Sequence, residues 1–421
     1  MDIIAAFKSA FGLKKLTHSS LSEASEKFNT ALSDSEKRRI CRSIGLSVIE
    51  KLGMPGSSVD SPVTGKTDVS GTAVLGVNHV GPLDVSIEWR TQSGELVPVK
   101  RLIDSGGDQI NVSKVFSAFE SEIALVALTG QKNGIITNAW ERSFLSPFIK
   151  PLFLRSDSED TPVAVYNIAD GHHLPVLFGW LDALSEKTVA SLNGKVMETL
   201  EEMSKGTHKK LWMALSAGGP LRYQGKIACY RSLVKEIKEK YRDSVNMLID
   251  FKHVSGPEEA MSVLDLPRET PCDIIKPNLQ EFLQIVRAGE LAGPDLDEKT
   301  VPAPATVKKY AAKLREKYNL EGVLVSMDKN GLILALKDRM ISEKGVKIRP
   351  ASHTAAGDSL KAGLLYALSN GKSYEEAVHA GNLFGASTAA MEGSQTVTPE
   401  KLAEITALAR EQNVKPVVEE L

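Results

Sequence analysis

A run of small residues opens a helical pattern near the end of the sequence, in the segment HTAAGDSLKAGLLYAL at 353–368. The small side chains of Ala355, Ala356 and Gly357 would let an anion approach the backbone, where the free N–H groups and positive end of a helix face it. Asp358, in the first turn, could accept the proton of an attacking hydroxyl. A plainer alternative is a helix start whose small residues pack against a neighbouring strand.

A second polar group stands in IIKPNLQEF at 274–282. A strand is expected to end at Lys276, and Asn278 and Glu281 follow, three residues apart on one helical face. Ligands of open α/β sheets bind at the carboxyl ends of strands, and an amide with a carboxylate could hold Mg²⁺ there through water. The alternative is a capping box, with Asn278 as the N-cap and Glu281 at the third helical position.

The elements that would position these groups follow an α/β pattern. From residue 72 onward, short β-branched apolar runs alternate with amphipathic helical patterns, which predicts a mostly parallel sheet with helices on both faces. Residues 84–107 and 161–178 instead alternate with period 2 and lack an intervening helix. We expect them to form antiparallel strands that leave the main sheet as a small β-lid over a cleft.

The remaining segments give the domain plan. Residues 1–52 have a helical apolar period and predict an N-terminal helical extension, and 53–71 are rich in Gly, Pro, Ser and Thr, as in a linker. Residues 72–400 form the expected main domain, and 401–421 a C-terminal helix and tail. The first residues, MDIIAAFKSAFGLKKL, are better explained by an amphipathic helix than by a cleaved targeting peptide.

The composition excludes several classes of function. The 51 basic and 53 acidic residues leave a net charge of −2, which argues against nucleic-acid binding through a general basic field. No apolar run reaches the length of about 18 residues that would span a membrane. The 3 cysteines are far apart and odd in number, which excludes a disulfide framework or a CxxC zinc knuckle and predicts a reducing, cytoplasmic location.

Taken together, these motifs resemble the PfkB (ribokinase-like) family of carbohydrate kinases over about residues 72–400, and most of all its 1-phosphofructokinase and tagatose-6-phosphate kinase group. HTAAGDS is similar to the family's GAGDS signature, KPNLQE to its Lys-Pro-Asn-x-x-Glu element, and SGGDQINVSKV stands where the family has GGKGxN. VNHVGPLDVSIE resembles the opening strand with its sugar-binding aspartate, and GNLFGASTAAMEG the helix that closes over adenine. The resemblance implies a ribokinase-like three-layer αβα sandwich with a mostly parallel sheet and a small β-lid, here with the N-terminal helical extension.

The resemblance also implies ATP- and Mg²⁺-dependent phosphoryl transfer to a hydroxyl of a sugar or sugar-like molecule. Asp358 would be the base, and the turn Ala355, Ala356, Gly357 and Asp358 would form the anion hole through its backbone amides. Nucleotide contacts would come from Lys276, Asn278, Glu281, Ser326, Asp328, Gly331, Asn382 and Gly385, with Asn278 and Glu281 positioning Mg²⁺. The sugar would be held by Asp84, Gly106, Gly107, Asp108 and Asn111. A homodimer through the lid is a further implication of the resemblance.

Several positions depart from the family pattern. Asp108 takes the place of a lysine, Gln109 that of a glycine, and Val165 that of an arginine which helps the hexose-phosphate group bind the substrate phosphate. A carboxylate and an aliphatic side chain are poor partners for a phosphorylated sugar. Asp328 replaces a glycine of the nucleotide loop. Ala355 replaces the first glycine of the anion hole, which is tolerable at negative φ and obstructive if the turn needs positive φ.

Two hypotheses of different class follow. The first is a kinase whose acceptor preference has moved away from sugar phosphates. The second is a catalytically weak or inactive homologue that acts as a ligand-binding or scaffold protein. The presence of the base Asp358 together with Asn278 and Glu281 favours the kinase, because a chain without catalysis has no chemical use for all three.

Overall fold

The structure is a computed structural model that describes most of the chain. The described residues are 3–52, 67–131, 134–156, 160–170, 172–179, 186–206, 210–216, 226–251, 258, 260–261, 264, 273–293, 295–296, 301–352, 354–392 and 395–420. The larger part of the predicted linker, 53–66, lies outside these residues, as does His353 of the HTAAGDS segment.

The described residues form a ten-stranded main sheet in the order β15-β14-β13-β12-β11-β10-β9-β1-β4-β5. Adjacent strands from β12 to β5 are parallel, and β13, β14 and β15 extend the sheet in antiparallel fashion. The central strands β4, β9 and β10 are apolar runs buried on both faces, as parallel sheets require, whereas β5 at one edge is partly buried and β15 at the other is exposed. The bounds of the strands of the main sheet are β1 Val74–Val80, β4 Ile123–Thr129, β5 Ile149–Arg155, β9 Leu211–Ser216, β10 Val245–Asp250, β11 Ile274–Lys276, β12 Gly322–Ser326, β13 Leu332–Ala335, β14 Arg339–Glu343 and β15 Val417–Glu420.

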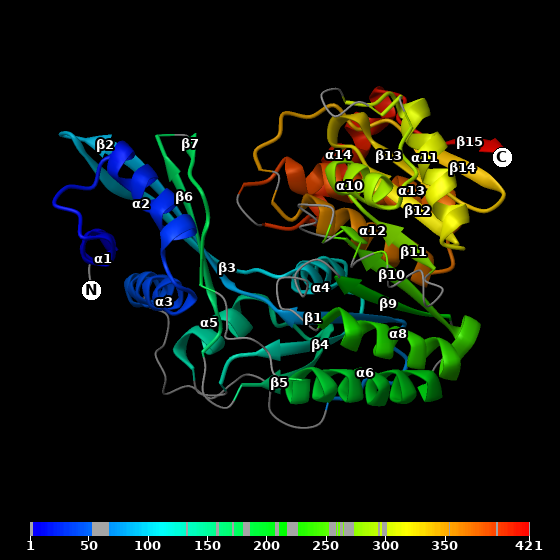
Figure 1. Cartoon of the computed structure of the whole chain (residues 1–421), viewed down its shortest axis with the longest axis horizontal. Coiled ribbons are helices and arrows are strands. Elements are labelled where there is room, and N and C mark those ends of the chain that lie inside the picture. The colour runs from blue at the N-terminus through cyan, green and yellow to red at the C-terminus, as the bar shows by residue number, and fades with distance from the viewer. Residues whose placement is uncertain are drawn as a thin grey trace.

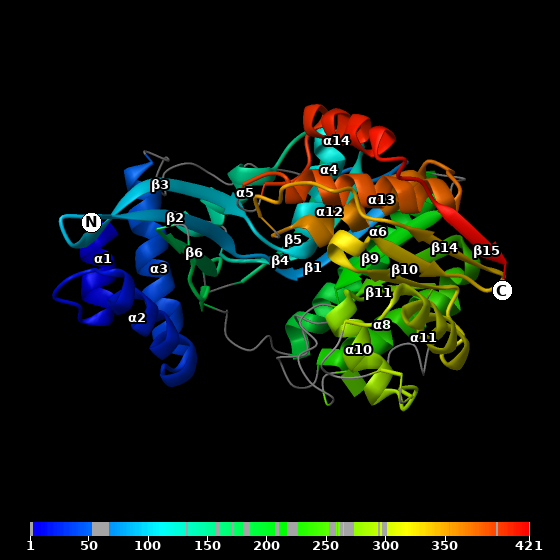
Figure 2. The ribbon, with the colours of Figure 1, turned by 90° about the horizontal axis from the view of Figure 1, so that it is seen from above.

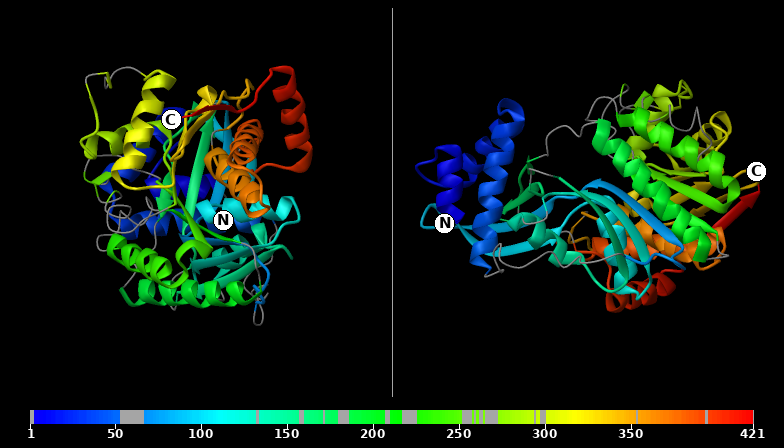
Figure 3. Two further views of the ribbon diagram at one scale, coloured as in Figure 1. Left: turned by 90° about the vertical axis from the view of Figure 1, so that its right-hand side faces the viewer. Right: turned by 90° about the horizontal axis from the view of Figure 1, so that it is seen from below.

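Helices cover both faces of the main sheet, which gives the three layers that the sequence predicts (Figures 2 and 3). One layer holds α4 (Asp108–Ala118), α12 (Ala356–Ser369), α13 (Tyr374–Ala389) and α14 (Pro399–Glu411). The opposite layer holds α6 (Glu186–Gly206), α8 (Lys226–Tyr241), α10 (Leu279–Ala288) and α11 (Pro304–Lys317), and α5 (Ile135–Phe144) lies near the lid. The buried apolar side chains accordingly gather in two large clusters, one for each layer. The helical pattern predicted in the segment 353–368 corresponds to α12.

A second sheet of five strands forms the predicted lid. Its strands are β2 (Leu83–Gln92), β3 (Glu95–Ser105), β6 (Val163–Ala169), β7 (His172–His173) and β8 (Leu177–Gly179). The β2–β3 pair is antiparallel, as expected, but β6 runs parallel to β2, so the prediction of antiparallel strands was wrong for this pair. The reason is topological: α4, β4, α5 and β5 lie between these strands in the chain, and a long crossover of this kind permits parallel pairing.

Three N-terminal helices, α1 (Ile3–Phe11), α2 (His18–Ala31) and α3 (Asp34–Lys51), cover one face of the lid sheet (Figure 1). We call them the lid cover. Capping boxes at Thr17 and Ser33 begin α2 and α3. Phe7 packs edge-on against Trp89 of β2, with ring centroids 5.1 Å apart. A Cβ on Gly45 of α3 would lie 3.0 Å from Cγ2 of Val163, so the two surfaces are in close contact.

The period of two along a strand separates the two faces of the lid. Val85, Ile87 and Trp89 are buried on the covered face, and Asp84 points to the opposite face, toward the main domain. Val165 pairs with Val85 on the covered face and is fully buried. The sequence analysis treated Val165 as a side chain near the substrate phosphate; the structure corrects this, because Val165 belongs to the apolar core beneath the lid cover.

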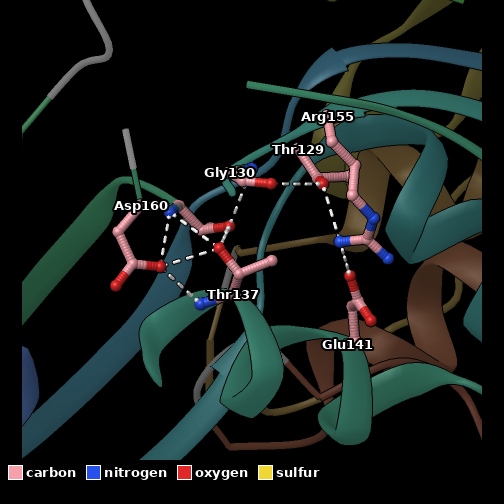
Figure 4. Close-up of polar contacts among 7 residues, drawn as sticks. Thr129, Gly130, Thr137, Glu141, Arg155 and Asp160 are labelled. Carbon is pink, nitrogen blue, oxygen red and sulfur yellow. Dashed lines mark hydrogen bonds and ion pairs between the residues drawn. The ribbon is translucent and has the colours of Figure 1, made fainter. Parts of the chain in front are cut away.

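A polar cluster joins the lid to the main domain at the ends of β4 and β5 (Figure 4). The Asp160 carboxylate, just before β6, accepts hydrogen bonds from the backbone N–H groups of Ile136 (3.2 Å) and Thr137 (2.8 Å), and so caps α5. The Thr161 hydroxyl donates to the Thr137 hydroxyl (2.9 Å) and accepts from the Gly130 amide (3.2 Å). These bonds fix the point where the chain enters the lid.

Candidate active site

Asp358 lies in the first turn of α12, buried among groups from the main domain and the lid. The side-chain amide of Asn111, on α4, donates a hydrogen bond of 2.8 Å to Oδ2 of Asp358. Asp84 of the lid lies close enough to Asp358 for the two charges to interact. Burial raises the pKa of Asp84 well above the usual range; the positive charge of Lys114 lowers this pKa, and the negative charges of Asp104 and Asp358 raise it further. The predicted base and the predicted sugar-binding side chains therefore meet.

The turn from β3 into α4 brings backbone against the Asp84 carboxylate. A Cβ on Gly106 would lie 2.4 Å from Oδ1 of Asp84, and Gly107 has φ of 115°, a conformation that favours glycine. The predicted residues Asp84, Gly106, Gly107 and Asn111 are thus neighbours. Asp108 begins α4 directly after the turn.

Several buried polar atoms around this turn have no hydrogen-bond partner among the described residues. They are Asp84 Oδ1, Asn111 Oδ1, Asn78 Nδ2 and Gln109 Oε1. Buried polar atoms in native proteins are nearly always bonded, so a ligand rich in hydroxyl groups would supply partners of both kinds here. Asn78 and Gln109 were not among the predicted site residues. The side-chain oxygen Oδ1 of Asn78 accepts a hydrogen bond of 3.3 Å from the backbone N–H of Gln109, which joins residues 31 positions apart.

The turn before α12 has the form that an anion site needs. Ala355 is the N-cap residue, and Ala356 and Gly357 are the first helical residues, whose amides have no partner within a helix. The Asp358 amide donates to the Ala355 carbonyl at 3.1 Å, so of the predicted anion-hole donors this one is partly used by the turn itself. The ammonium group of Lys276 lies 3.7 Å from the position of a Cβ on Gly357, which places a cation beside the turn.

Ala355 has φ of 62°, so this turn does require a left-handed residue. An alanine in this region is strained by roughly 1–2 kcal/mol, whereas glycine is not. We expect Ala355→Gly to raise the free energy of unfolding by about 1 kcal/mol, measured by urea denaturation. Ala362→Gly, a buried position inside the same helix, is the matched control and should lower it by about 1 kcal/mol. If Ala355→Gly and Ala362→Gly lowered the free energy of unfolding equally, Ala355 would not be strained in this turn.

Asn278 and Glu281 form the capping box that the sequence analysis kept as an alternative. The Asn278 side chain accepts from the Glu281 amide, and the Glu281 carboxylate accepts from the Asn278 amide, both at 2.9 Å. Ser326 of β12 forms a parallel bridge to Asn278, so these three predicted nucleotide residues are adjacent. The side-chain oxygen atoms of the pair suit Mg²⁺, and since Mg²⁺ usually keeps several of its waters, contact through water fits this pair. Within the described part of the chain, no group of three or more His, Cys, Asp or Glu side chains that could hold a metal occurs.

The other predicted nucleotide residues are arranged around the end of β14. The Asn382 side-chain amide donates to Oε1 of Glu343 (2.8 Å) and to the Lys344 carbonyl (2.9 Å). A Cβ on Gly331 would lie 1.9 Å from the Glu343 carbonyl oxygen, so glycine is required there, and Asp328 stands in the preceding turn. Gly385 has a different position: it packs α13 against α12, where its Cβ would lie 3.3 Å from the Ala356 carbonyl oxygen.

Two charged residues beside the site escaped the sequence analysis, Asp250 at the end of β10 and Lys361 in α12. The Lys361 ammonium group lies 2.9 Å from Oδ2 of Asp250 and 3.6 Å from Oδ1 of Asp358, and it is fully buried. Lys276 lies 3.1 Å from the other oxygen of Asp250. The available signal was the helical spacing of three between Asp358 and Lys361, which puts both on one face.

The lid also contacts the main domain away from this centre. Lys100 of β3 forms an ion pair with Glu392, which follows α13, and this hydrogen bond raises the pKa of Lys100. Among the described residues, no helix combines the length and the apolar character that a membrane crossing needs.

Comparisons with known proteins agree with this arrangement. Phosphofructokinase-2 from Escherichia coli, in a crystal structure of a mutant, superposes with a TM-score of 0.63 at 15% identity, covering 80% of this chain and 100% of that chain. Ribokinase from Thermotoga maritima gives 0.59 at 18% identity, covering 80% and 99%. A putative phosphofructokinase from Staphylococcus aureus gives 0.59 at 19% identity, covering 83% and 99%. These likenesses confirm the ribokinase-like fold.

The sequence comparisons cover less of the chain. A ribokinase from Haemophilus influenzae is 26% identical over 129 residues, which make up 31% of this chain and only 42% of that protein. Residues 193–401, which include α12 and α13, match the family of pfkB carbohydrate kinases. This chain therefore carries a pfkB family carbohydrate kinase domain, as its motifs predict.

Proposed function

We propose that the chain transfers the γ-phosphoryl group of ATP, with Mg²⁺, to a hydroxyl of a sugar or sugar-like acceptor that carries no phosphate. The observation that supports this best is the hydrogen bond of 2.8 Å between Asn111 and Asp358. This bond joins two parts of the proposed site. Asp358 stands at the start of α12, beside the anion turn, and Asn111 stands in α4, next to the buried polar atoms without partners around Asp84.

The residues would divide the reaction between them. Asp358 accepts the proton of the acceptor hydroxyl, whose oxygen forms the new bond to phosphorus while the bond to ADP breaks. Asn111 holds the carboxylate in place. The first amides of α12 and the Lys276 ammonium group stabilise the charge of the transferring group. When bound, Mg²⁺ neutralises phosphate charge, and Asn278 and Glu281 would hold it through water.

The charges around the acceptor end favour a neutral molecule. Asp84, Asp104 and Asp358 lie close enough to affect one another, and the nearby Lys114 is already paired with Asp104 at 2.9 Å. A phosphate group placed beside the carboxylates of Asp104 and Asp358 would be repelled, and burial of Asp84, which raises its pKa, leaves it better suited to a neutral hydroxyl than to an anion. Free sugars and other polyols instead offer hydroxyls to Asp84 and Asn111.

The test is ADP formation from ATP and Mg²⁺ across free sugars, the corresponding sugar phosphates and nucleosides. We expect turnover with an unphosphorylated acceptor, and at least tenfold lower kcat/KM for its phosphate ester. A preference for the ester would overturn the acceptor class. If no acceptor is used but ATP binds, the second hypothesis of the sequence analysis, a ligand-binding or scaffold protein, becomes the better one. A cytoplasmic location stays a prediction from the cysteine pattern.

The lid cover changes what is expected of the oligomeric state. A tetrameric inhibited form is known for phosphofructokinase-2 from E. coli, and the sequence resemblance implies a homodimer through the lid. Here α1–α3 occupy one full face of the lid sheet, and Asp84 on the other face points to the site. We therefore expect a monomer of 45.6 kDa in sedimentation velocity. A species of twice this mass would restore the dimer prediction.

A further inference from the structure

We propose that Lys361 is a positioning residue that places its positive charge against the Asp358 carboxylate and links it, through Asp250, to the lysine beside the anion turn. The inference rests on the proposed function, because it assigns Lys361 a role in the work of the base. Lys361 touches no substrate in this scheme and acts through Asp358 alone.

Four charged side chains form a row of alternating sign. Asp358 is followed by Lys361 at 3.6 Å, Lys361 by Asp250 at 2.9 Å, and Asp250 by Lys276 at 3.1 Å. Each of the four side chains is less than 5% exposed. Charges buried in this way are retained only when paired, and each member of the row has an opposite charge beside it.

The row ends at the two places where charge would change during the reaction. Asp358, at one end, is the proposed acceptor of the hydroxyl proton. Lys276, at the other end, lies beside Gly357 in the anion turn. Asp250 contacts both lysines with different oxygen atoms, so it fixes their ammonium groups relative to each other.

Polar and charged groups face Asp358 from three elements. From β2, Asp84 faces it, but burial raises the pKa of Asp84 well above the usual range and so favours its neutral, protonated form. Behind Asp84 stand Asp104 and its partner Lys114. From α4, Asn111 donates a neutral hydrogen bond. From its own helix, Lys361 supplies a full positive charge to the second oxygen of the carboxylate.

Stability alone does not require a lysine at this position. It lies on the buried face of α12, with Leu360, Ala362 and Leu364 nearby in the helix, where a methionine would fill a similar volume. Replacing a whole set of buried ionised side chains by apolar ones is often neutral for stability, although removing one partner alone is destabilising. The charge is therefore explained better by its effect on Asp358.

The test uses two variants that act on Asp358 with opposite sign. Lys361→Met removes the positive neighbour and leaves Asp250 and Asp84, so the titration midpoint of Asp358 should rise by about one unit. Asp250→Asn removes the negative neighbour of Lys361 and frees its charge for Asp358, so the midpoint should fall. In both variants Lys276 and the anion turn remain.

The first readout is the ¹³C NMR signal of the Asp358 carboxyl carbon, assigned with Asp358→Asn and followed from pH 4 to 9 in the full chain. The second is the acid limb of kcat against pH, which should move in the same direction as the NMR midpoint. For Lys361→Met, kcat should therefore be roughly tenfold lower than in the wild type at the acidic end of the profile and little changed above pH 8. A purely structural role would lower kcat equally at all pH values.

The outcomes separate the two proposals. Opposite shifts of the NMR midpoint support the role of Lys361, even if no acceptor is turned over and the proposed function fails. Unchanged midpoints in both folded variants overturn the role of Lys361, while turnover of the wild type would still support the kinase. If Lys361→Met does not fold, Lys361→Gln, which removes the charge but keeps a donor, takes its place with the same expected shift.

Discussion

Asp358→Asn should lower phosphoryl transfer by about 10³-fold, because an amide cannot accept the proton of the acceptor hydroxyl. The substitution keeps the size of the side chain, and its oxygen can still accept from Asn111 or Lys361. We therefore expect an unchanged circular dichroism spectrum and ATP affinity within a factor of about 3, since the nucleotide residues around β12 and β14 are not altered. The measurement is kcat with the best acceptor of the panel.

The matched control is Asp338→Asn, the same chemical change on a side chain that is 69% exposed between β13 and β14. It should leave kcat and stability unchanged. Turnover of Asp358→Asn within a factor of ten of wild type would show that another group takes the proton. The anion turn could then still be the phosphate site, but the assignment of the base would be lost.

Phe7→Ala should lower the free energy of unfolding of the lid and its cover by about 3–5 kcal/mol. Phe7 is fully buried, and its ring meets Trp89, which is itself fixed by a hydrogen bond from its indole N–H to Asn167 (2.9 Å). Removing the ring leaves a cavity between α1 and the sheet. Denaturation followed by tryptophan fluorescence measures the loss, and Val99→Ala, at a 42% exposed residue of the same sheet, is the control.

The same variant should also change the kinetics in a specific way. Trp89 and Asp84 belong to one strand and point to opposite faces, so a loosened cover disturbs the acceptor side of the site. We expect a higher KM for the acceptor and an unchanged KM for ATP, whose proposed residues lie in the main domain. An equal change in both would mean that the damage is not confined to the lid.

The sequence predicted the parts of this molecule that depend on local pattern. Apolar runs and helical periods predicted the three layers, the N-terminal helices and the helix that begins after Ala355. The resemblance to the carbohydrate kinase family implied that Asp84, Gly106, Asn111 and Asp358 belong to one site. Their contacts in the structure agree with that expectation.

What the sequence could not predict depends on contacts between distant segments. One example is the parallel pairing of β6 with β2, which places Val165 on the covered face of the lid. This pairing depends on which strands become neighbours in the fold, and the hydrophobic period within one strand does not predict it. The burial of Lys361 depends in part on Asp250, 111 residues earlier in the chain, so its local sequence pattern did not mark it as part of the site. The value of φ at Ala355 was likewise open, since the sequence shows an alanine and not its conformation.

The lid cover has a consequence for the order in which the chain is made. α3 ends at Lys51, but the last strand that it covers, β8, ends at Gly179, about 130 residues later. At a synthesis rate of about 5–20 residues per second, the side of α3 that packs on β8 waits roughly 6–25 s for that strand, although β2, on which Phe7 packs, is made earlier. During synthesis these helices are thus a natural target for a chaperone that binds exposed apolar segments, whereas a full-length chain refolding from denaturant has the partner strands present from the start.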